Sequence, residues 1–344
     1  MNLYLDETLE LGSNGNQGNL LGIQPYMLAA DYASEETFFE KMDGYLEAAL
    51  QKGWLYPNTV VALPEYLGSW LVILGEKAQV RQAKTIDQAM RPIILRSMLP
   101  FIQELLSSRE SNRVNASIFR IKAAQMARAY QAVFSKLAAK YGVTIVGGSI
   151  LLPTPTVQDG VITAGKGALY NVSAVFKPDG GVHPALSVKA FPIATELPFV
   201  ACGSTANLPV FETPAGRLGV LVCADSFYPQ AYEQLKSLRV DLIVVPSFST
   251  GKGLWNQPWG NYSGAEAPAD VDLADARQLT EGEAWHKYAL LGRIVSAGAK
   301  YGVNVFLHGE LWDLEAENSP SIMVNGQKWV ESVATRGALL NLWL

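Results

Sequence analysis

A short apolar segment that ends at a cysteine constrains the fold of this chain more than any other stretch. Residues 218–222 read LGVLV, without alternation of polar and apolar side chains, and Cys223 follows directly. Such a block is typical of a strand that is covered on both faces. Asp225 and Ser226 can cap a following helix, and Pro229 suits its first turn. The cysteine is therefore expected between a strand and a helix, with its thiol facing helix amides that lower a thiol pKa and stabilise an oxyanion.

The two cysteines of the chain have different sequence contexts. Cys202 lies in a loop of small residues, PFVACGST, without a preceding buried strand, and we interpret it as structural or incidental. Two cysteines are too few for a disulfide framework. A single cysteine after a buried strand is also most often a small core residue, so a catalytic role for Cys223 requires a base elsewhere in the chain.

Length and composition describe an ordinary globular chain of 344 residues, of which 49% are hydrophobic and 17% charged. No Pro-rich or Ser-rich linker divides it. The net charge of -5 and the lack of a basic cluster argue against nucleic acid or an anionic membrane as partners, and favour a small neutral or basic substrate. The N-terminus is acidic and unlike a signal peptide, and no apolar run reaches the length of a spanning helix, so we expect a cytoplasmic protein.

Apolar periodicity alternates between strand and helix along the chain, which predicts an α/β fold. Residues 18–27, 35–52 and 60–63 are expected to form a first strand, helix and strand. Residues 71–140 are strongly helical in composition and are expected to pack over a sheet; a cover over the site or a subunit contact stays open. Residues 249–281 form a loop rich in Gly, Pro and Trp that is too long to be a mere connector.

The catalytic base is expected among the carboxylates rather than the histidines. None of the three histidines has a metal-ligand spacing, so we expect no metal site. Glu65 follows the apolar run VVAL and Pro64, which places a carboxylate at a strand end, where α/β proteins gather their sites. Lys189 ends a short strand, and Glu196 follows it within the same loop. Taken singly, each of these groups is equally well interpreted as a solvated surface charge.

Three motifs occur in an order that resembles the carbon–nitrogen hydrolase, or nitrilase, superfamily, whose members use a glutamate, a lysine and a cysteine in this chain order. The motifs are LPEY around Glu65, VKAFPIATE from Lys189 to Glu196, and VLVCAD around Cys223. The segments VGGS, LYNVSAVFKPDGG, FETPAGRLGVLVCAD and VDLIVVPS fall where this family places its flanking strands. Three separated motifs in register form a far more specific signal than any one of them.

The resemblance implies a four-layer α-β-β-α sandwich of the nitrilase type, formed by a single domain. We expect this carbon–nitrogen hydrolase domain over residues 18–344 and an N-terminal extension over residues 1–17. The helical segment 71–140 is longer than in compact members of the family and would be an enlargement within the domain.

The resemblance also implies the roles of the site residues. Glu65 would take the thiol proton of Cys223 and later return it to the leaving nitrogen, while the thiolate attacks a carbonyl or nitrile carbon. Lys189 and the backbone N–H of Ala224 would hold the developing oxyanion. Glu196 matches a second glutamate that many members carry beside the lysine, where it orients groups and positions the substrate. No cofactor and no metal take part in this scheme.

The residues after the cysteine bear on the substrate. Family members that hydrolyse nitriles commonly have Trp-Glu there, whereas this chain has Ala224 and Asp225, nearer the amide-hydrolysing branches. We therefore expect hydrolysis of a carbon–nitrogen bond in a small, non-peptide amide or N-carbamoyl compound. Three alternatives stay open: conversion of a nitrile to an acid, acyl transfer to an amine, and a catalytically silent member that serves as a binding subunit.

Five side chains are candidates for the substrate pocket, with core or loop packing as the alternative for each. They lie beside the expected catalytic residues or at the end of the next strand: Tyr66, Phe191, Phe227, Phe248 and Ser249. The resemblance further implies a homodimer or a larger homo-oligomer, with helices that flank the cysteine strand at the contact. Apart from another copy of the chain, a small-molecule substrate is the partner we expect.

Overall fold

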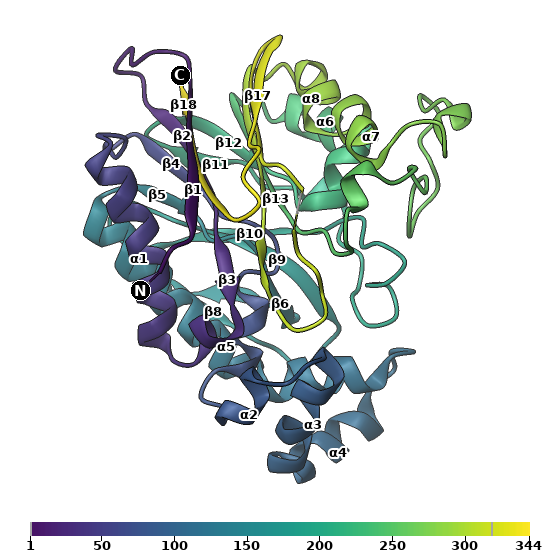
Figure 1. The fold of residues 1–344 in the computed structure, drawn as a ribbon. Coiled ribbons are helices and arrows are strands. Elements are labelled where there is room, and N and C mark those ends of the chain that lie inside the picture. Colours follow the sequence, from purple (N-terminus) through teal and green to yellow (C-terminus); the bar gives the residue numbers. More distant parts are fainter. Residues whose placement is uncertain (1, 318) are drawn as a thin grey trace.

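Two β-sheets form the centre of the molecule in the computed structural model, which describes residues 2–317 and 319–344 (Figure 1). The larger sheet has the order β1 (Leu5–Leu11), β18 (Gly337–Trp343), β2 (Asn19–Gln24), β4 (Thr59–Ala62), β5 (Thr144–Val146), β9 (Leu169–Phe176) and β10 (Val182–Val188), with β6 (Ile150–Pro153) also paired to β9. The smaller sheet has the order β11 (Phe211–Thr213), β12 (Gly216–Val220), β13 (Leu242–Ser247), β14 (Tyr301–Phe306), β16 (Ile322–Asn325) and β17 (Lys328–Glu331).

Helices and two short strand pairs complete the fold. The small pairs are β3 (Tyr26–Leu28) with β15 (His308–Glu310), and β7 (Thr156–Gln158) with β8 (Val161–Thr163). The α-helices are α1 (Glu35–Gln51), α2 (Ala78–Arg81), α3 (Ile86–Arg96), α4 (Met98–Ser107), α5 (Arg113–Tyr141), α6 (Pro229–Ser237), α7 (Glu281–Tyr288) and α8 (Leu290–Arg293). Within the described ranges, no helix has the length and apolar character needed to cross a membrane.

Aliphatic side chains from both sheets meet in the space between them. Val60 and Leu340 from the larger sheet, and Leu218, Val244 and Val303 from the smaller one, belong to one buried cluster. Strands β4 and β13 also bury their other faces, which is why their runs read as continuously apolar rather than alternating. The core between the sheets therefore fixes how the strand ends of one sheet lie against those of the other.

Helices cover the outer face of each sheet. On the larger sheet, Phe38 of α1 and Phe134 of α5 meet edge to face, and Tyr130 of α5 packs on Phe176 of β9. On the smaller sheet, Tyr232 and Leu235 of α6 and Leu290 of α8 are buried in one cluster with residues of β13 and β16. This arrangement confirms the expected four-layer α-β-β-α sandwich.

The segment 1–17 differs from its expected role as an extension. Its residues 5–11 form β1, which pairs in parallel with β18 at the edge of the larger sheet. The chain therefore begins the sheet with its N-terminal strand and returns to the same place with its C-terminal strand. The strand was not recognised from the sequence because acidic side chains interrupt its apolar residues. An edge strand tolerates this pattern, since it needs only one apolar face.

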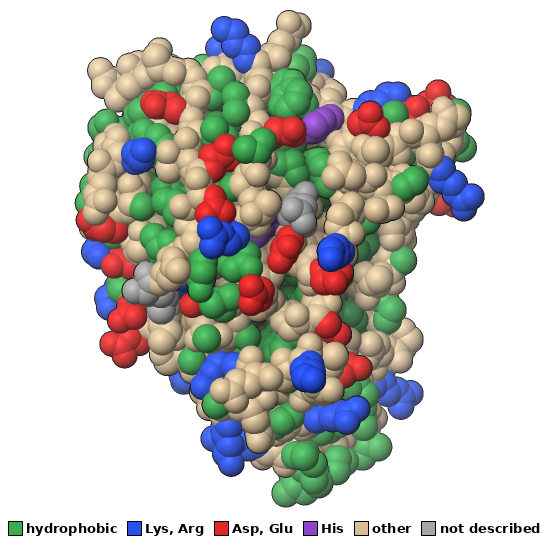
Figure 2. Space-filling model, viewed as in Figure 1, with side chains coloured by type: hydrophobic (Ala, Val, Ile, Leu, Met, Phe, Trp, Pro, Cys, Tyr) green, Lys and Arg blue, Asp and Glu red, His purple; other side chains and the backbone are tan. Residues whose placement is uncertain are grey.

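The helical segment 71–140 forms α2, α3, α4 and most of α5. Figure 1 shows α2, α3 and α4 together at one end of the molecule, beyond the edges of the sheets. Apolar side chains of this end are exposed: Leu95, Met98, Leu99, Ile102 and Leu106. Figure 2 shows hydrophobic side chains at its lower end, where α3 and α4 lie in the same view.

One loop between β5 and β6 holds the turn that follows β4. The Pro64 carbonyl accepts a hydrogen bond from the N–H of Ser149 at 3.3 Å, and the Ser149 hydroxyl accepts one from the N–H of Tyr66 at 2.9 Å. Gly148, which has a φ of +69°, allows this approach, since a Cβ there would lie 2.1 Å from the Pro64 carbonyl oxygen. The VGGS motif is thus the support on which the Glu65 turn rests.

We expect Gly148→Ala to destabilise the protein far more than Gly53→Ala. Gly53 has nearly the same φ, +70°, but no atom lies within 4 Å of a Cβ placed there. Gly53→Ala should cost about 1 kcal/mol from its left-handed backbone alone, whereas Gly148→Ala should cost at least ~3 kcal/mol because it adds the clash with Pro64. Urea unfolding of both variants measures the difference, and equal losses would mean that the close approach is unimportant.

Candidate active site

Glu65 is buried at the carboxyl end of β4. The strand ends at Ala62, and the N–H of Leu63 still donates to the carbonyl of Val146 at 3.1 Å. Pro64 then turns the chain, and Tyr66 adopts a left-handed backbone with a φ of +62°. Only 1% of Glu65 is exposed, so its carboxylate depends on protein groups rather than water for hydrogen bonds.

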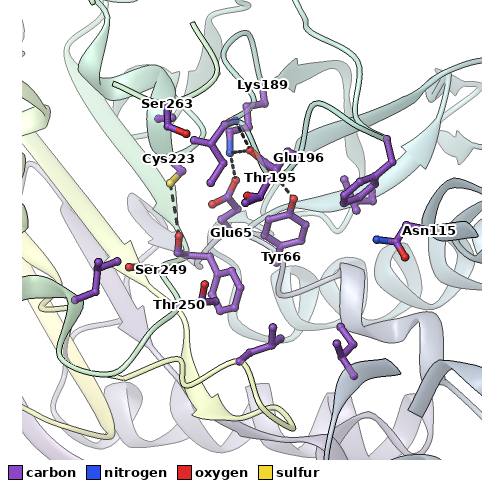
Figure 3. A pocket seen from close by; sticks show the side chains of 18 of the residues that line it. Glu65, Tyr66, Asn115, Lys189, Thr195, Glu196, Cys223, Ser249, Thr250 and Ser263 are labelled. Carbon is purple, nitrogen blue, oxygen red and sulfur yellow. Dashed lines mark hydrogen bonds and ion pairs between the residues drawn. The ribbon is translucent and has the colours of Figure 1, made fainter. Parts of the chain in front are cut away.

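Lys189 joins the two glutamates. It follows the last residue of β10, and its N–H donates to the carbonyl of Asn171 on β9 at 2.9 Å. Its Nζ lies 2.7 Å from Oε1 of Glu65 and 2.6 Å from Oε2 of Glu196 (Figure 3). The lysine is 1% exposed, so one buried ammonium bridges two carboxylates that lie far apart in the sequence.

Cys223 occupies a sharp turn rather than the end of the strand itself. β12 ends at Val220, and Cys223 begins a short 3-10 helix, Cys223–Phe227, with a left-handed φ of +52°. Such a backbone is rare for a residue with a side chain and is retained only where the surroundings impose it. The Sγ points into the cavity and lies 3.8 Å from the carbonyl oxygen of Phe248.

The predicted caps of the following helix are wrong. α6 begins at Pro229 as expected, but its N-cap residue is Tyr228, without a side-chain cap. The Ser226 hydroxyl donates instead to the carbonyl of Cys223 at 2.7 Å. Asp225 accepts from the N–H of Val222 at 3.2 Å. Both polar side chains therefore hold the cysteine turn, and the 3-10 helix separates this turn from α6.

Asp225 also connects the cysteine turn to the lysine loop. Its Oδ1 accepts hydrogen bonds from the N–H groups of Ala190 at 2.9 Å and Phe191 at 2.8 Å, directly after Lys189. Burial raises the pKa of this carboxyl to about 6, with the three N–H donors and Lys189 acting against the rise. One fully buried side chain thus sets the position of Lys189 relative to Cys223.

Burial determines the direction of the pKa shift for two of the four expected catalytic groups, Glu65 and Cys223. It raises the pKa of Glu65 to about 7, because Lys189 offsets only part of the cost of burying a carboxylate beside Glu196. It also raises the pKa of the Cys223 thiol well above its ordinary value, with the charge of Glu65 acting in the same direction. The resting thiol is therefore neutral, and the Glu65 carboxylate can take up and release a proton near neutral pH.

The other two groups keep their charges. Burial favours the neutral form of Glu196, but Lys189, with hydrogen bonds from Tyr66 and the Ile193 N–H, holds the pKa of Glu196 below its ordinary value. Burial would likewise lower the pKa of Lys189, but Glu65 and Glu196 together raise it well above the usual range. The site therefore contains a permanent ammonium and a permanent carboxylate beside a base that can change its protonation.

Two hydrogen-bond donors of this cluster were not found from the sequence. Asn171 donates through Nδ2 to Oε1 of Glu65 at 2.8 Å and to Oε1 of Glu196 at 3.4 Å. The hydroxyl of Tyr66, expected only as a pocket wall, donates to Oε1 of Glu196 at 2.5 Å. An asparagine within the apolar strand LYNVSAVF was a usable signal, because a polar side chain buried in a strand needs partners.

A cavity of about 1050 Å³ contains the four groups and Ala224. Tyr66, Phe227, Phe248 and Ser249 also line it, as expected for the pocket. Phe191 is not among its lining residues, because its ring stacks on Tyr228 with centroids 3.6 Å apart and its backbone is held by Asp225.

Two segments without an assigned role form the walls of this cavity. Helices α3 and α5 of the segment 71–140 line one side, and the loop 249–281 lines another. Within the loop, Trp259 stacks on Tyr288, and the hydroxyl of Tyr262 donates to the carbonyl of Phe227 at 2.9 Å. The loop aromatics therefore both anchor the loop and contribute to the wall beside Cys223.

The comparison with protein families agrees with this arrangement. Residues 20–267 match the family described as carbon-nitrogen hydrolase. The match spans well over half of the chain, and the chain therefore belongs to the carbon–nitrogen hydrolase family. The resemblance that the three motifs indicated is therefore confirmed.

Relatives with assigned names match part of the chain. The probable hydrolase YhcX of Bacillus subtilis (strain 168) is 25% identical over 146 residues, which cover 42% of this chain and 26% of that protein. The omega-amidase NIT2 of Danio rerio is 29% identical over 132 residues, which cover 36% of this chain and 44% of that protein. The chain thus matches less than half the length of each.

Solved structures resemble nearly the whole chain in fold. An amidase from Nesterenkonia sp. has a TM-score of 0.56 at 13% identity, covering 97% of this chain and 92% of its own. A carbon–nitrogen hydrolase from Helicobacter pylori G27 has a TM-score of 0.55 at 16% identity, covering 94% and 89%. At such identities the likeness establishes the fold, which is the expected nitrilase-type sandwich.

We expect the alkylation rate of Cys223 by iodoacetamide to rise with pH through about 7. Below this pH the Glu65 carboxyl is protonated and cannot accept the thiol proton; above it, the carboxylate can. In Glu65→Gln this step should disappear and leave only the ionisation of a thiol whose pKa burial has raised.

The measurement is mass spectrometry of Cys202→Ala, which leaves Cys223 as the single thiol because Cys202 is the other cysteine and is exposed. Glu65→Gln is made in the same background. An unchanged pH profile in Glu65→Gln would mean that Glu65 does not control the thiol proton.

Proposed function

We propose that the protein hydrolyses the carbon–nitrogen bond of a non-peptide amide or N-carbamoyl compound through a thioester on Cys223. The observation that carries the proposal is the meeting of Glu65, Lys189 and Cys223 in one cavity, with both charged groups 1% exposed. In a mutant of the amidase from Nesterenkonia sp. AN1, the acetamide moiety of fluoroacetamide is added covalently at the active-site cysteine. That structural neighbour, with the omega-amidase relative, favours an amide over a nitrile.

The first step forms the thioester. Glu65 takes the thiol proton, and the Cys223 sulfur attacks the carbonyl carbon of the amide. The carbonyl oxygen becomes an oxyanion, which Lys189 and the backbone N–H of Ala224 stabilise. Ala224 lies in the first turn of the 3-10 helix, where backbone N–H groups have no acceptor within the helix.

The following steps release both products. Glu65 returns its proton to the nitrogen as the carbon–nitrogen bond breaks, so ammonia or an amine leaves and the thioester remains. Glu65 then accepts a proton from water, whose oxygen attacks the thioester carbon. Collapse of the second oxyanion breaks the carbon–sulfur bond, releases the acid and returns the proton to the thiol. A pKa of about 7 suits Glu65 to this exchange of roles.

Glu196 serves as a positioning residue in this scheme. It holds the ammonium of Lys189 at 2.6 Å, and it accepts hydrogen bonds from Tyr66 and from the N–H of Ile193 at 2.8 Å. These donors keep the carboxylate ionised and so keep Lys189 directed at the reacting carbonyl. A permanent charge, rather than a proton transfer, is its contribution.

The assembly and location remain predictions beside this proposal. We expect a homodimer or larger homo-oligomer in the cytoplasm, which size-exclusion chromatography with light scattering and cell fractionation would measure.

We expect intact-mass spectrometry to detect an acyl adduct on the wild type when it turns over an amide or N-carbamoyl compound, together with release of ammonia. Cys223→Ala should show neither, because it lacks the sulfur that forms the thioester. Cys202→Ala is the matched control and should retain both.

The substrate panel should include nitriles and added amines. Turnover of nitriles alone, or transfer of the acyl group to the amine instead of water, would replace the proposed reaction by one of the alternatives. Turnover that persists in Cys223→Ala would refute the thiol mechanism. A protein with no adduct and no ammonia release on any compound would be a silent member of the family.

We expect Tyr66→Phe to lower kcat by about tenfold or more, with a smaller change in KM, since the variant removes a hydrogen bond that supports a charged group. The ring remains, so the fold should be unaffected. Tyr32→Phe is the control, because its buried hydroxyl has no partner in the described structure and lies outside the cavity. Equal effects of the two variants would remove Tyr66 from the positioning network.

A further inference from the structure

The cavity beside Cys223 is much larger than a small amide requires. Its volume is about 1050 Å³, at the upper end of the roughly 300–1000 Å³ that pockets for drug-sized ligands span. A primary amide of a few carbons would occupy only the part next to Glu65, Lys189 and Cys223. The remaining volume must therefore hold either water or another part of the substrate.

Apolar side chains of α3 and of the first turns of α5 line the remaining volume. Ile86, Met90 and Ile94 line the cavity at intervals of four residues, which places them on one face of α3. Val114 and Ile118 do the same on α5. We call this part of the cavity the apolar arm; its remaining lining residues are Phe119, Leu151 and Phe199.

Packing within the protein leaves part of the surface of the apolar-arm side chains accessible. Met90 and Ile94 are half-buried, and Val114 is 46% exposed. Other residues of the same two helices are completely buried. Phe119 and Phe199 stack with nearly parallel rings and form a flat apolar wall. The displacement of water from such a surface by an apolar group is favourable in free energy.

Polar groups border this arm as well. The charged cluster around Lys189 lines the same cavity, and Asp87, Arg91 and Asn115 line it beside the apolar residues of α3 and α5. In the view of Figure 3, Tyr66 lies between Cys223 and Asn115, and Asn115 directly follows Val114 of the arm on α5.

We infer that the substrate is an amide with an extended apolar group, such as an alkyl chain, which packs in the apolar arm while its carbonyl carbon lies at Cys223. This inference rests on the proposed amide hydrolysis and specifies its substrate class. It also gives the segment 71–140 a role in selecting the substrate. A short amide reaches the same catalytic groups but leaves the arm filled with water.

The test is a series of primary amides from butyramide to octanamide, with N-alkyl acetamides of matching length as a second series. We expect kcat/KM to rise by up to about fourfold for each added methylene that enters the arm, in whichever series directs its chain along α3. Flat or falling kcat/KM in both series would overturn the inference.

Two methionine variants determine where the chain binds. Met90→Gln places a polar amide in the apolar arm, and we expect it to lower the octanamide-to-butyramide ratio of kcat/KM by about tenfold. Met98→Gln makes the same change on neighbouring α4, at a side chain that is 48% exposed and outside the cavity. It should leave the ratio unchanged. An equal loss in both variants would place the chain on the exposed face of α4 and refute binding in the arm.

Calorimetry with Cys223→Ala separates this inference from the proposed reaction. The variant cannot form the thioester, but it should bind octanamide more tightly than butyramide, and Met90→Gln in the same background should remove the difference. Preferential binding of octanamide without turnover by the wild type would contradict only the proposed hydrolysis. Turnover of short amides without any gain from chain length would contradict only the inference.

Discussion

The buried ammonium of Lys189 is the interaction on which the site depends. Transfer of one ammonium and two carboxylates out of water costs several kcal/mol for each ion, and attraction between them repays this only with good geometry and further hydrogen bonds. Both conditions hold, since Lys189 lies within 2.7 Å of both carboxylates, and Asn171 donates to each of them. The network also affects protonation, because its single ammonium cannot fully neutralise the charges of two carboxylates. Burial, together with the uncompensated charge of Glu196, raises the pKa of Glu65 to about 7 and thus makes it a base near neutral pH.

Backbone geometry brings the sulfur to this charged cluster. Cys223 and Tyr66 both have left-handed backbones, one beside the nucleophile and the other beside the base. Each conformation is unfavourable by itself and is held by hydrogen bonds between the turn and a neighbouring loop. Asp225 holds the cysteine turn against the loop after Lys189, and Ser149 holds the Glu65 turn. The two sheets therefore contribute a rigid frame, while short polar contacts between their connecting loops set the positions of the reacting atoms.

The sequence sufficed to predict the strand-end groups of this site but not the contacts between them. Glu65, Lys189 and Cys223 could be found because the motifs around them occur in the chain order of the carbon–nitrogen hydrolase family; taken singly, none of the three residues identified a site. The Asp225 and Ser226 side chains were wrongly expected to cap a helix, because the same residue types satisfy N–H groups in any tight turn. Phe191 was placed in the pocket from its neighbourhood in the chain, but its stacking on Tyr228 is a long-range contact. β1 was missed because it is an edge strand with acidic residues, and because its partner, β18, lies at the opposite end of the chain.

Chemistry and substrate choice are carried by different layers of this fold. The catalytic groups stand on strand ends between the sheets, where almost any insertion would disturb the core or the buried charges. The apolar arm is made mainly by α3 and α5, outside the sheets, and it shares one cavity with the charged cluster. Substitutions on these helix faces can alter the width and polarity of the arm without moving Lys189 or Cys223. These helices are therefore the part of this architecture in which a change of substrate costs the least stability.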